Sequence, residues 1–531
     1  MVIWRSFKMS DSSMSWFRKK TFHESGKALA LPVCLLALLT LALPGQAIES
    51  RKVEKMIEGA QPREVQAFMA REREKILNRG RSVFQKFCIH CHGERGKGDG
   101  AATPYLTPLP RDLSSGIFKF HSTKNIALPL DRDLARTIEK GIPGTVMPAW
   151  GEILGPEAIH SLVQYLKTFS DRFGQEIPDS KITIEPEPPF DRLSVQQGKI
   201  LFRQMRCGHC HGDDGQRAGP LEDSMKDVWG HTSFVYDLQQ PGLYKAGAAS
   251  EEIFQTLSVG MDGTPMTTYD YLTVDERWHL VHYLQSLFAS APPVPTRRSL
   301  VSLATDQPLA VDADHPAWQT APALTVRLAP IRFRKHPIQE VTVQAIHNQK
   351  QIAFRMQWAD PSPEGAAISD FPDEAAIQFA LGHQTVAQGP FYGMGERQKP
   401  VNIWHWKADA NQSIFTTPSN NSATGHPVPP VRKFLNPFNE SPVEELNASG
   451  FGTLQVQPLV YQHLEGRGQW RAGQWTVVFL RDLETHSPND INFKSGGRFL
   501  LAFAVWDGAN RDKNANKVVS FWQSLTLDAD E

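Results

Sequence analysis

The stretch Cys88-Ile89-His90-Cys91-His92 decides the fold of the first half of this chain, and it returns as Cys207-Gly208-His209-Cys210-His211. In each copy two residues separate a pair of thiols, and a histidine follows at once. Thiols at this spacing can add across the two vinyl groups of a haem, and the adjacent imidazole is then held under the iron. A zinc or thiol-redox site also uses Cys-x-x-Cys, but the histidine in both copies favours a covalent c-type haem.

Composition describes an ordinary globular protein of several domains. The chain has 531 residues, 40% of them hydrophobic, and a formal net charge of -1. That length suggests about three to four domains. A nearly neutral chain has no excess of positive charge to hold nucleic acid, so no nucleic-acid partner is predicted.

The N-terminus has the pattern of an export signal. Arg18, Lys19 and Lys20 precede an apolar run over 28–43, and Gly45-Gln46-Ala47 offers small residues for cleavage. We therefore predict a signal peptide over 1–47 and a periplasmic location. The apolar run is shorter than the roughly 20 residues that span a bilayer, so an uncleaved N-terminal anchor is the weaker alternative.

The first haem motif lies in a segment with helical patterning. Residues 48–77 predict a charged helical lead-in, and 78–173 predict a small helical domain. We expect one helix from Gly80 into the motif, another over about 134–140 and a last one over about 156–169. Met147 lies in a Gly/Pro loop, and a thioether on the open side of the iron suits an electron-transfer haem.

Residues 193–288 repeat this plan, with Gly198 expected to open the first helix. Met147 follows His92 by 55 residues, and Met266 follows His211 by the same 55. A Gly-Thr pair precedes both methionines at the same distance. We therefore predict Met147 and Met266 as the second iron ligands. Met261 competes with Met266, but it does not align with a methionine in the first copy.

Residues 78–173 and 193–288 each resemble a class I cytochrome c. The resemblance implies an all-α fold around one haem, with His92 and Met147 on the first iron and His211 and Met266 on the second. Cys88, Cys91, Cys207 and Cys210 would carry the covalent bonds. Met266 is followed by Thr267 where Met147 is followed by Pro148, which is a small departure from the pattern.

Two proline-rich stretches mark the domain boundaries. A Pro/Glu linker over 174–192 reads as a stiff extended spacer, and a Pro-rich linker over 289–299 ends the second unit. From 300 to 531 the pattern becomes strand-like, with β-prone runs over 351–358, 475–480 and 499–505. Long loops between such runs predict an all-β sandwich. The segment over 416–442 is expected to be a surface loop or a partner-binding insertion.

This last portion resembles the haem b-binding domain of the ethylbenzene dehydrogenase gamma subunit, in the type II dimethyl sulfoxide reductase family. The matching stretches are Trp358-Ala359-Asp360, Phe371-Pro372-Asp373, Gly393-Met394-Gly395, Val401 to Asp409, Gly450-Phe451-Gly452-Thr453, Phe503 to Gly508 and Lys517-Val518-Val519-Ser520.

The family implies a β-sandwich that holds one non-covalent b haem between a methionine and a lysine. Carried over to this chain, the methionine is Met394 and the lysine is Lys517. A lysine ligand must be neutral, so it should be buried with a lowered pKa. Lys407, Lys513 and His405 are the alternatives to Lys517.

The leading hypothesis is a multihaem electron-transfer subunit. No hydrolase or phosphate-binding motif is present, and irons with two protein ligands leave no open position for substrate. The resemblance implies a molybdenum catalytic subunit and an iron-sulfur subunit as partners, with a soluble cytochrome or membrane redox complex at the other end. The first motif is expected to hold the outer end of the haem chain.

Two alternatives stay open. The sandwich could be a haem-free docking or ligand-binding module attached to a dihaem cytochrome. One iron could also be open and catalytic, for example in peroxide reduction.

Overall fold

The computed structural model describes residues 62–217, 219–289, 299–365, 371–382, 385–408 and 441–528. The predicted signal peptide, the first part of the lead-in, most of the second linker and nearly all of the loop over 416–442 lie outside the described residues. Among the described helices, none is both long and apolar enough to cross a membrane.

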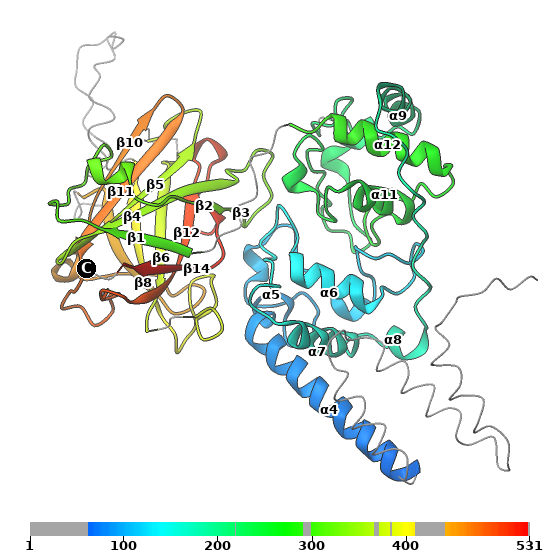
Figure 1. Cartoon of the computed structure of the whole chain (residues 1–531), viewed down its shortest axis with the longest axis horizontal. Coiled ribbons are helices and arrows are strands. Elements are labelled where there is room, and N and C mark those ends of the chain that lie inside the picture. Colours follow the sequence, from blue (N-terminus) through cyan, green and yellow to red (C-terminus); the bar gives the residue numbers. More distant parts are fainter. Residues whose placement is uncertain are drawn as a thin grey trace, which may run out of the picture. The chain divides into compact units, whose positions relative to one another are not determined.

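Residues 62–217 and 219–289 form two helical domains, each with one Cys-x-x-Cys-His motif (Figure 1). The helices of the first are α4 (Pro62–Phe87), α5 (Ile89–His92), α6 (Asp131–Lys140), α7 (Pro156–Lys167) and α8 (Arg172–Gln175). Those of the second are α9 (Arg192–Gln204), α10 (Gly208–His211), α11 (Ser250–Val259) and α12 (Val274–Ser286). Short 3₁₀ turns lie at Thr103–Tyr105, Leu113–Ser115, Glu222–Ser224 and Pro241–Leu243.

Gly80 and Gly198 do not begin helices, contrary to expectation. Gly80 lies inside α4, which is continuous with the lead-in, and Gly198 lies inside α9. A Cβ on Gly80 would lie 2.1 Å from the Ser161 carbonyl oxygen of α7, and one on Gly198 would lie 1.9 Å from the His279 carbonyl oxygen of α12. Glycine is therefore needed where two helix backbones cross closely, which a local pattern does not reveal.

Each haem domain has its own apolar core. In the first, Phe84 of α4 packs with Leu162 and Trp150. In the second, Phe202 of α9 packs with Phe254 and the fully buried Trp278. Between the domains, residues 176–191 contain no helix or strand, as the Pro/Glu composition predicts.

The region after 299 is built of strands (Figure 1). Their bounds are β1 Ser299–Ala304, β2 Leu324–Arg327, β3 Ala329–Pro330, β4 Glu340–His347, β5 Gln351–Ala359, β6 Glu374–Ala380, β7 Val401–Lys407, β8 Val443–Ala448, β9 Gln455–Val456, β10 Glu465–Arg471, β11 Gln474–Asp482, β12 Arg498–Trp506, β13 Val518–Val519 and β14 Gln523–Leu527. The three runs predicted as strands correspond to β5, β11 and β12. Short 3₁₀ turns lie at Pro316–Gln319, Leu459–Tyr461 and Gly508–Asn510.

The hydrogen-bonded order is β10-β11-β5-β4-β1-β14-β12-β6-β7-β8-β9. Most neighbours are antiparallel, but β1 runs parallel to both β4 and β14 and thereby links the two halves of the ladder. Apolar residues from both halves, including Phe354, Trp404 and Trp475, share one core. This arrangement is the sandwich that the alternating pattern predicts.

A second apolar cluster lies on the other face of β6, β7, β8 and β12. It is floored by the alanines Ala376, Ala380, Ala448, Ala502 and Ala504 and includes Trp506. Residues that alternate along a strand point to opposite faces, so these positions are separate from the central core. The cluster also contains larger side chains, Val401, Ile403, Leu446, Leu500 and Trp522.

Candidate haem sites

The first haem motif lines a cavity that Met147 also lines. Cys88 follows the last residue of α4, and Cys88, Cys91, His92 and Met147 all line a cavity of about 200 Å³. His92 Nδ1 lies 3.3 Å from the Arg111 carbonyl oxygen, so that nitrogen donates and Nε2 is left to bind a metal. Burial lowers the pKa of His92, which favours the neutral imidazole that ligation requires.

The second motif lines a larger cavity of about 880 Å³, together with Met266. Cys207 immediately precedes α10, and Cys210 and His211 are the last two residues of that helix. Burial lowers the pKa of His211 to about 4, so this ring is neutral near pH 7. The donor set of each cavity, two thiols with an imidazole and a thioether, fits a c-type haem.

The two methionine loops share one hydrogen-bond pattern. Ile142 N donates to Met147 O at 3.0 Å, and Met261 N donates to Met266 O at 3.0 Å. In each loop the threonine hydroxyl accepts from the methionine N–H at 3.2 Å and donates to the earlier carbonyl at 2.7 Å. Met261 therefore stands where the first loop has Ile142. This correspondence favours Met266, although Met261 also lines the cavity.

Met394 and Lys517 both adjoin the alanine-floored face of the sandwich. Met394 packs against the cluster from the loop after β6, and its backbone has a φ of 79°. The Lys517 ammonium lies 4.5 Å from the centroid of the Trp506 ring, which belongs to the same cluster. Burial lowers the pKa of Lys517 to about 8, against a smaller opposing effect of Glu374. Lys517 is half-buried, and its ammonium donates to the Asn514 carbonyl oxygen at 3.3 Å. A thioether, a lysine of lowered pKa and an apolar face are the kinds of group that can hold a non-covalent haem.

Comparison with known proteins agrees with this division of the chain. The family model described as ethylbenzene dehydrogenase matches residues 315–430 and 457–517. The model for subunit III of cbb3-type cytochrome c oxidase matches 76–166, and the cytochrome c model matches 195–288. The chain joins two cytochrome c domains to an ethylbenzene dehydrogenase domain.

Three similar proteins with described roles each align with about two fifths of this chain. A putative respiratory nitrate reductase haem subunit of Haloferax mediterranei is 27% identical over 41% of this chain and 68% of its own length. The dimethylsulfide dehydrogenase gamma subunit of Rhodovulum sulfidophilum is 27% identical over 39% and 72%. The chlorate reductase gamma subunit of Ideonella dechloratans is 26% identical over 39% and 75%.

Within the ethylbenzene dehydrogenase domain, the alternatives to Lys517 are engaged elsewhere or exposed. Both ring nitrogens of His405 face carboxylates, Glu374 at 2.9 Å and Glu444 at 3.0 Å. Burial lowers the pKa of His405, but these hydrogen bonds outweigh it and the net pKa is raised. Lys407 pairs with Glu444 at 2.9 Å, and Lys513 is exposed.

The loop that carries Met394 also contacts the first cytochrome c domain. The Phe391 ring stacks on His90 of the first motif, with centroids 4.3 Å apart. The Tyr392 hydroxyl donates to the Val146 carbonyl oxygen at 2.7 Å, beside Met147. Both aromatic side chains line the first haem cavity. Sequence reasoning missed these residues, although two adjacent aromatics immediately before Gly-Met-Gly were a visible signal.

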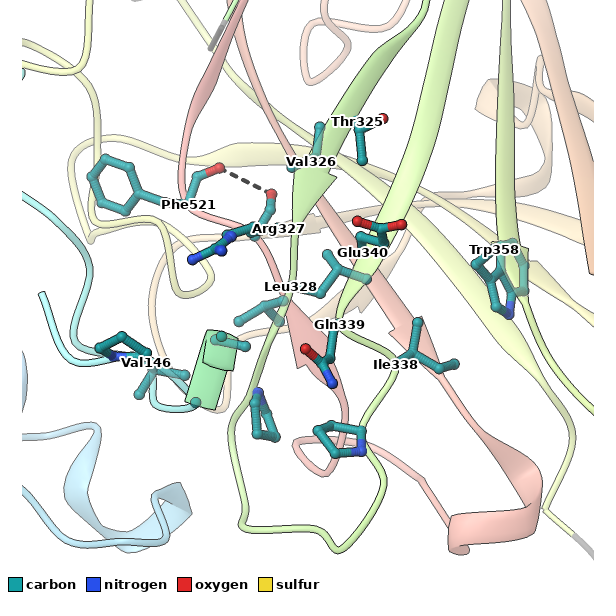
Figure 2. A pocket seen from close by; sticks show the side chains of 18 of the residues that line it. Val146, Thr325, Val326, Arg327, Leu328, Ile338, Gln339, Glu340, Trp358 and Phe521 are labelled. Carbon is teal, nitrogen blue, oxygen red and sulfur yellow. Dashed lines mark hydrogen bonds between the residues drawn. The ribbon is translucent and has the colours of Figure 1, made fainter. Parts of the chain in front are cut away.

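A further cavity of about 850 Å³ lies between the first cytochrome c domain and the ethylbenzene dehydrogenase domain. Figure 2 shows it with Val146 on one side and Arg327 and Leu328 on the other. Met147 lines this cavity too, but Met394 and Lys517 do not. It is therefore not the site implied for a b haem.

The ethylbenzene dehydrogenase domain also contains a group of buried carboxyls. Oxygen atoms of Asp360, Glu364, Asp373 and Asp507 all lie within 4.8 Å of one another. Burial raises the pKa of Asp360 to about 7 and that of Asp373 to about 8. Asp360 and Asp373 therefore keep their protons at a pH where exposed carboxyls are ionised.

Proposed function

We propose that this chain is an exported electron-transfer subunit with two c haems and one b haem. It would carry electrons between a molybdenum and iron-sulfur oxidoreductase and a cytochrome or membrane redox complex. The observation that carries the proposal is the loop over 391–394, which joins the ligand set of the sandwich to the wall of the first c-haem cavity. Haem supplies one-electron chemistry at its iron.

In the c domains, the proposed ligand pairs are His92 with Met147 and His211 with Met266. The hydrogen bond from His92 to the Arg111 carbonyl fixes the ring orientation. The threonine hydroxyl before each methionine holds the loop that presents the thioether. With two protein ligands each, these sites exclude small molecules and favour electron transfer over substrate chemistry.

In the sandwich, Met394 and Lys517 are the proposed ligands of a b haem. Met394 packs against the apolar cluster of this face, and Trp506 of the same cluster lies beside the lysine. The lowered pKa of Lys517 supports ligation, because only the neutral amine has a lone pair to donate.

The contacts support an order in which the first c site lies between the b site and the second c site. Phe391 and Tyr392 are within three residues of Met394, and they touch the first motif and its methionine loop. The first motif would then be the middle of the chain of sites and not its outer end.

The proposed partners rest on the relatives. Three of them are named as haem or gamma subunits of nitrate reductase, dimethylsulfide dehydrogenase and chlorate reductase. They support a molybdenum enzyme partner for this chain, and the predicted export signal supports a periplasmic one. Isolation of the tagged chain from its native host should bring down molybdenum and iron-sulfur subunits, and their absence would contradict this assignment.

A pyridine haemochrome assay of the purified chain tests the cofactor content. We expect c and b haem in a ratio of two to one. Lys517→Ala should remove or shift the b spectrum and leave both c haems, whereas the matched control Lys513→Ala should leave all three. C haem alone in the wild-type chain would instead support a haem-free docking module.

A ligand-binding test addresses the third possibility, an open catalytic iron. The reduced wild-type chain should not bind carbon monoxide, because all irons have two protein ligands. Met147→Ala should create one carbon monoxide site. Binding by the wild-type chain would point to an open iron.

A further inference from the structure

The two c-haem cavities share part of one wall. Residues that line both cavities include Arg111 and Lys119 of the first c domain and Lys245 of the second. Residues 108–110, which precede Arg111, also line both cavities. The cations therefore lie where the two cavities come closest.

These three cations have no close anionic partner among the described residues. Within 4.0 Å, none of them forms an ion pair there. Arg111 lies over the Trp229 ring at 4.4 Å, and Lys245 lies over the Tyr236 ring at 3.8 Å. Aromatic faces hold cations in place but do not neutralise them. Asp227 acts electrostatically on both Arg111 and Lys119, and Asp112 and Asp262 act on Arg111 alone. Asp227 lines the second cavity but not the first.

The electrostatics of these side chains favour binding of an anion beside them. Burial, together with the nearby charge of Arg111, lowers the pKa of Lys119 to about 8, against a smaller opposing effect of Asp227. Burial also brings the pKa of Lys245 well below its ordinary value, and both Lys119 and Arg111 add to this effect. Like charges that repel one another in a low dielectric need a counterion.

Haem carries two propionate groups, so two c haems bring four carboxylates to this region. We propose that Arg111, Lys119 and Lys245 form one cationic wall that binds propionates of both c haems and couples their reduction potentials. The structure supports this geometrically, since one set of cations lines both cavities and Lys245 crosses from the second domain to the first cavity. Charge-assisted hydrogen bonds to carboxylate are the interaction that such side chains form best.

Coupling follows from the position of the charges. Adding one electron to either iron converts Fe³⁺ to Fe²⁺ and lowers the local charge by one. A nearby cation favours that reduced state, so it raises the reduction potential of each haem that it approaches. Loss of one cation should therefore lower both potentials, including that of the haem in the other domain.

Spectroelectrochemical titration of the purified full-length holoprotein tests this. The reduction potentials of the two c haems are resolved from one another in a Met266→His background, because a second imidazole ligand lowers the potential of the second haem. In that background Lys245→Gln should lower the potential of the first haem as well as the second. Lys119→Gln, a change in the first c domain, should likewise lower the reduction potentials of both haems.

The matched controls are Lys199→Gln on α9 and Lys124→Gln, two exposed lysines of the same domains. Neither control should move either potential, and Lys245→Arg should restore the wild-type values because it keeps the charge. A shift confined to the haem of the mutated domain would show that the wall is not shared. No shift in either haem would refute propionate binding.

The inference rests on c haem in both cavities. The pyridine haemochrome assay measures that occupancy on the same sample, so a failure of the cationic wall is distinct from a failure of the proposed function.

Discussion

Gly198→Ala should destabilise the second cytochrome c domain because it places a methyl group against a backbone atom. The added Cβ would lie 1.9 Å from the His279 carbonyl oxygen. Even a weak C–H···O contact needs about 3.3 Å between carbon and oxygen, so α9 and α12 would have to separate by more than ~1 Å. A carbonyl in a helix cannot rotate away, in contrast to a flexible side chain.

The size of the effect can be estimated from two opposing terms. Overpacking of a close-packed site costs up to about 3 kcal/mol. Alanine is the better helix former by about 1 kcal/mol, which offsets part of that cost. The net loss is about 2 kcal/mol, which corresponds to a fall in melting temperature of roughly 8–16 °C for a domain of this size.

Calorimetry of the holoprotein, with haem absorption followed in parallel, measures this shift. Gly80→Ala should act in the same way on the first domain, where the Cβ would meet the Ser161 carbonyl oxygen at 2.1 Å. Gly174→Ala is the matched control, because nothing lies within 4 Å of its added Cβ. A melting temperature for Gly198→Ala that equals that of the control would refute the close-crossing explanation.

Three further predictions concern the sites. Thr264→Val removes the hydroxyl that accepts from the Met266 N–H and so loosens the loop that presents Met266. The reduced second haem should then bind carbon monoxide, which difference spectra would show. Absence of binding would mean that the loop keeps its position without this hydrogen bond. Tyr392→Phe leaves the Val146 carbonyl without its hydrogen-bond donor and should lower the free energy of unfolding by about 1–2 kcal/mol. Denaturant titration measures this loss, and an unchanged midpoint would contradict a stabilising role for the hydrogen bond. Because the pKa values of Asp360 and Asp373 are raised, these carboxyls stay protonated in the folded chain at pH values where they are ionised in the unfolded chain. The free energy of unfolding, measured in a chelating buffer, should therefore fall as pH rises from about 4 to about 8. The slope should be at most ~1.4 kcal/mol per pH unit for each carboxyl. Thermal unfolding across that range checks the sign, and Asp360→Asn should flatten the slope.

Covalent chemistry and local repetition explain what the sequence could predict. The Cys-x-x-Cys-His motifs, the equal spacing to Met147 and Met266, and the alternating run that became β5 are all properties of short segments. Chemistry or a repeat within one segment constrains them without knowledge of the rest of the fold. The motif stretches that resemble the ethylbenzene dehydrogenase family likewise predicted the character of the last domain, which its family model confirms.

The features that sequence reasoning missed depend on packing between segments far apart in the chain. Gly80 and Gly198 read as helix starts because their role, a close backbone crossing, involves a second helix more than 80 residues away. The contact of Phe391 with His90 joins positions about 300 residues apart. Lys245 reads as an ordinary surface lysine until the second domain brings it to the first cavity. No local periodicity carries such information.

Comparison of the two copies of the motif bears on where an external partner would act. The two methionine loops keep the same hydrogen bonds, so the two domains present Met147 and Met266 alike. The histidine just before the second cysteine of each motif differs in its surroundings: His90 stacks on Phe391, whereas the corresponding His209 is exposed. A face already covered by the chain's own sandwich cannot dock a second redox protein, but an exposed one can. Under the proposed function, the second cytochrome c domain is therefore the better candidate for exchange with a soluble or membrane partner, and the first is the better candidate for the connection to the sandwich.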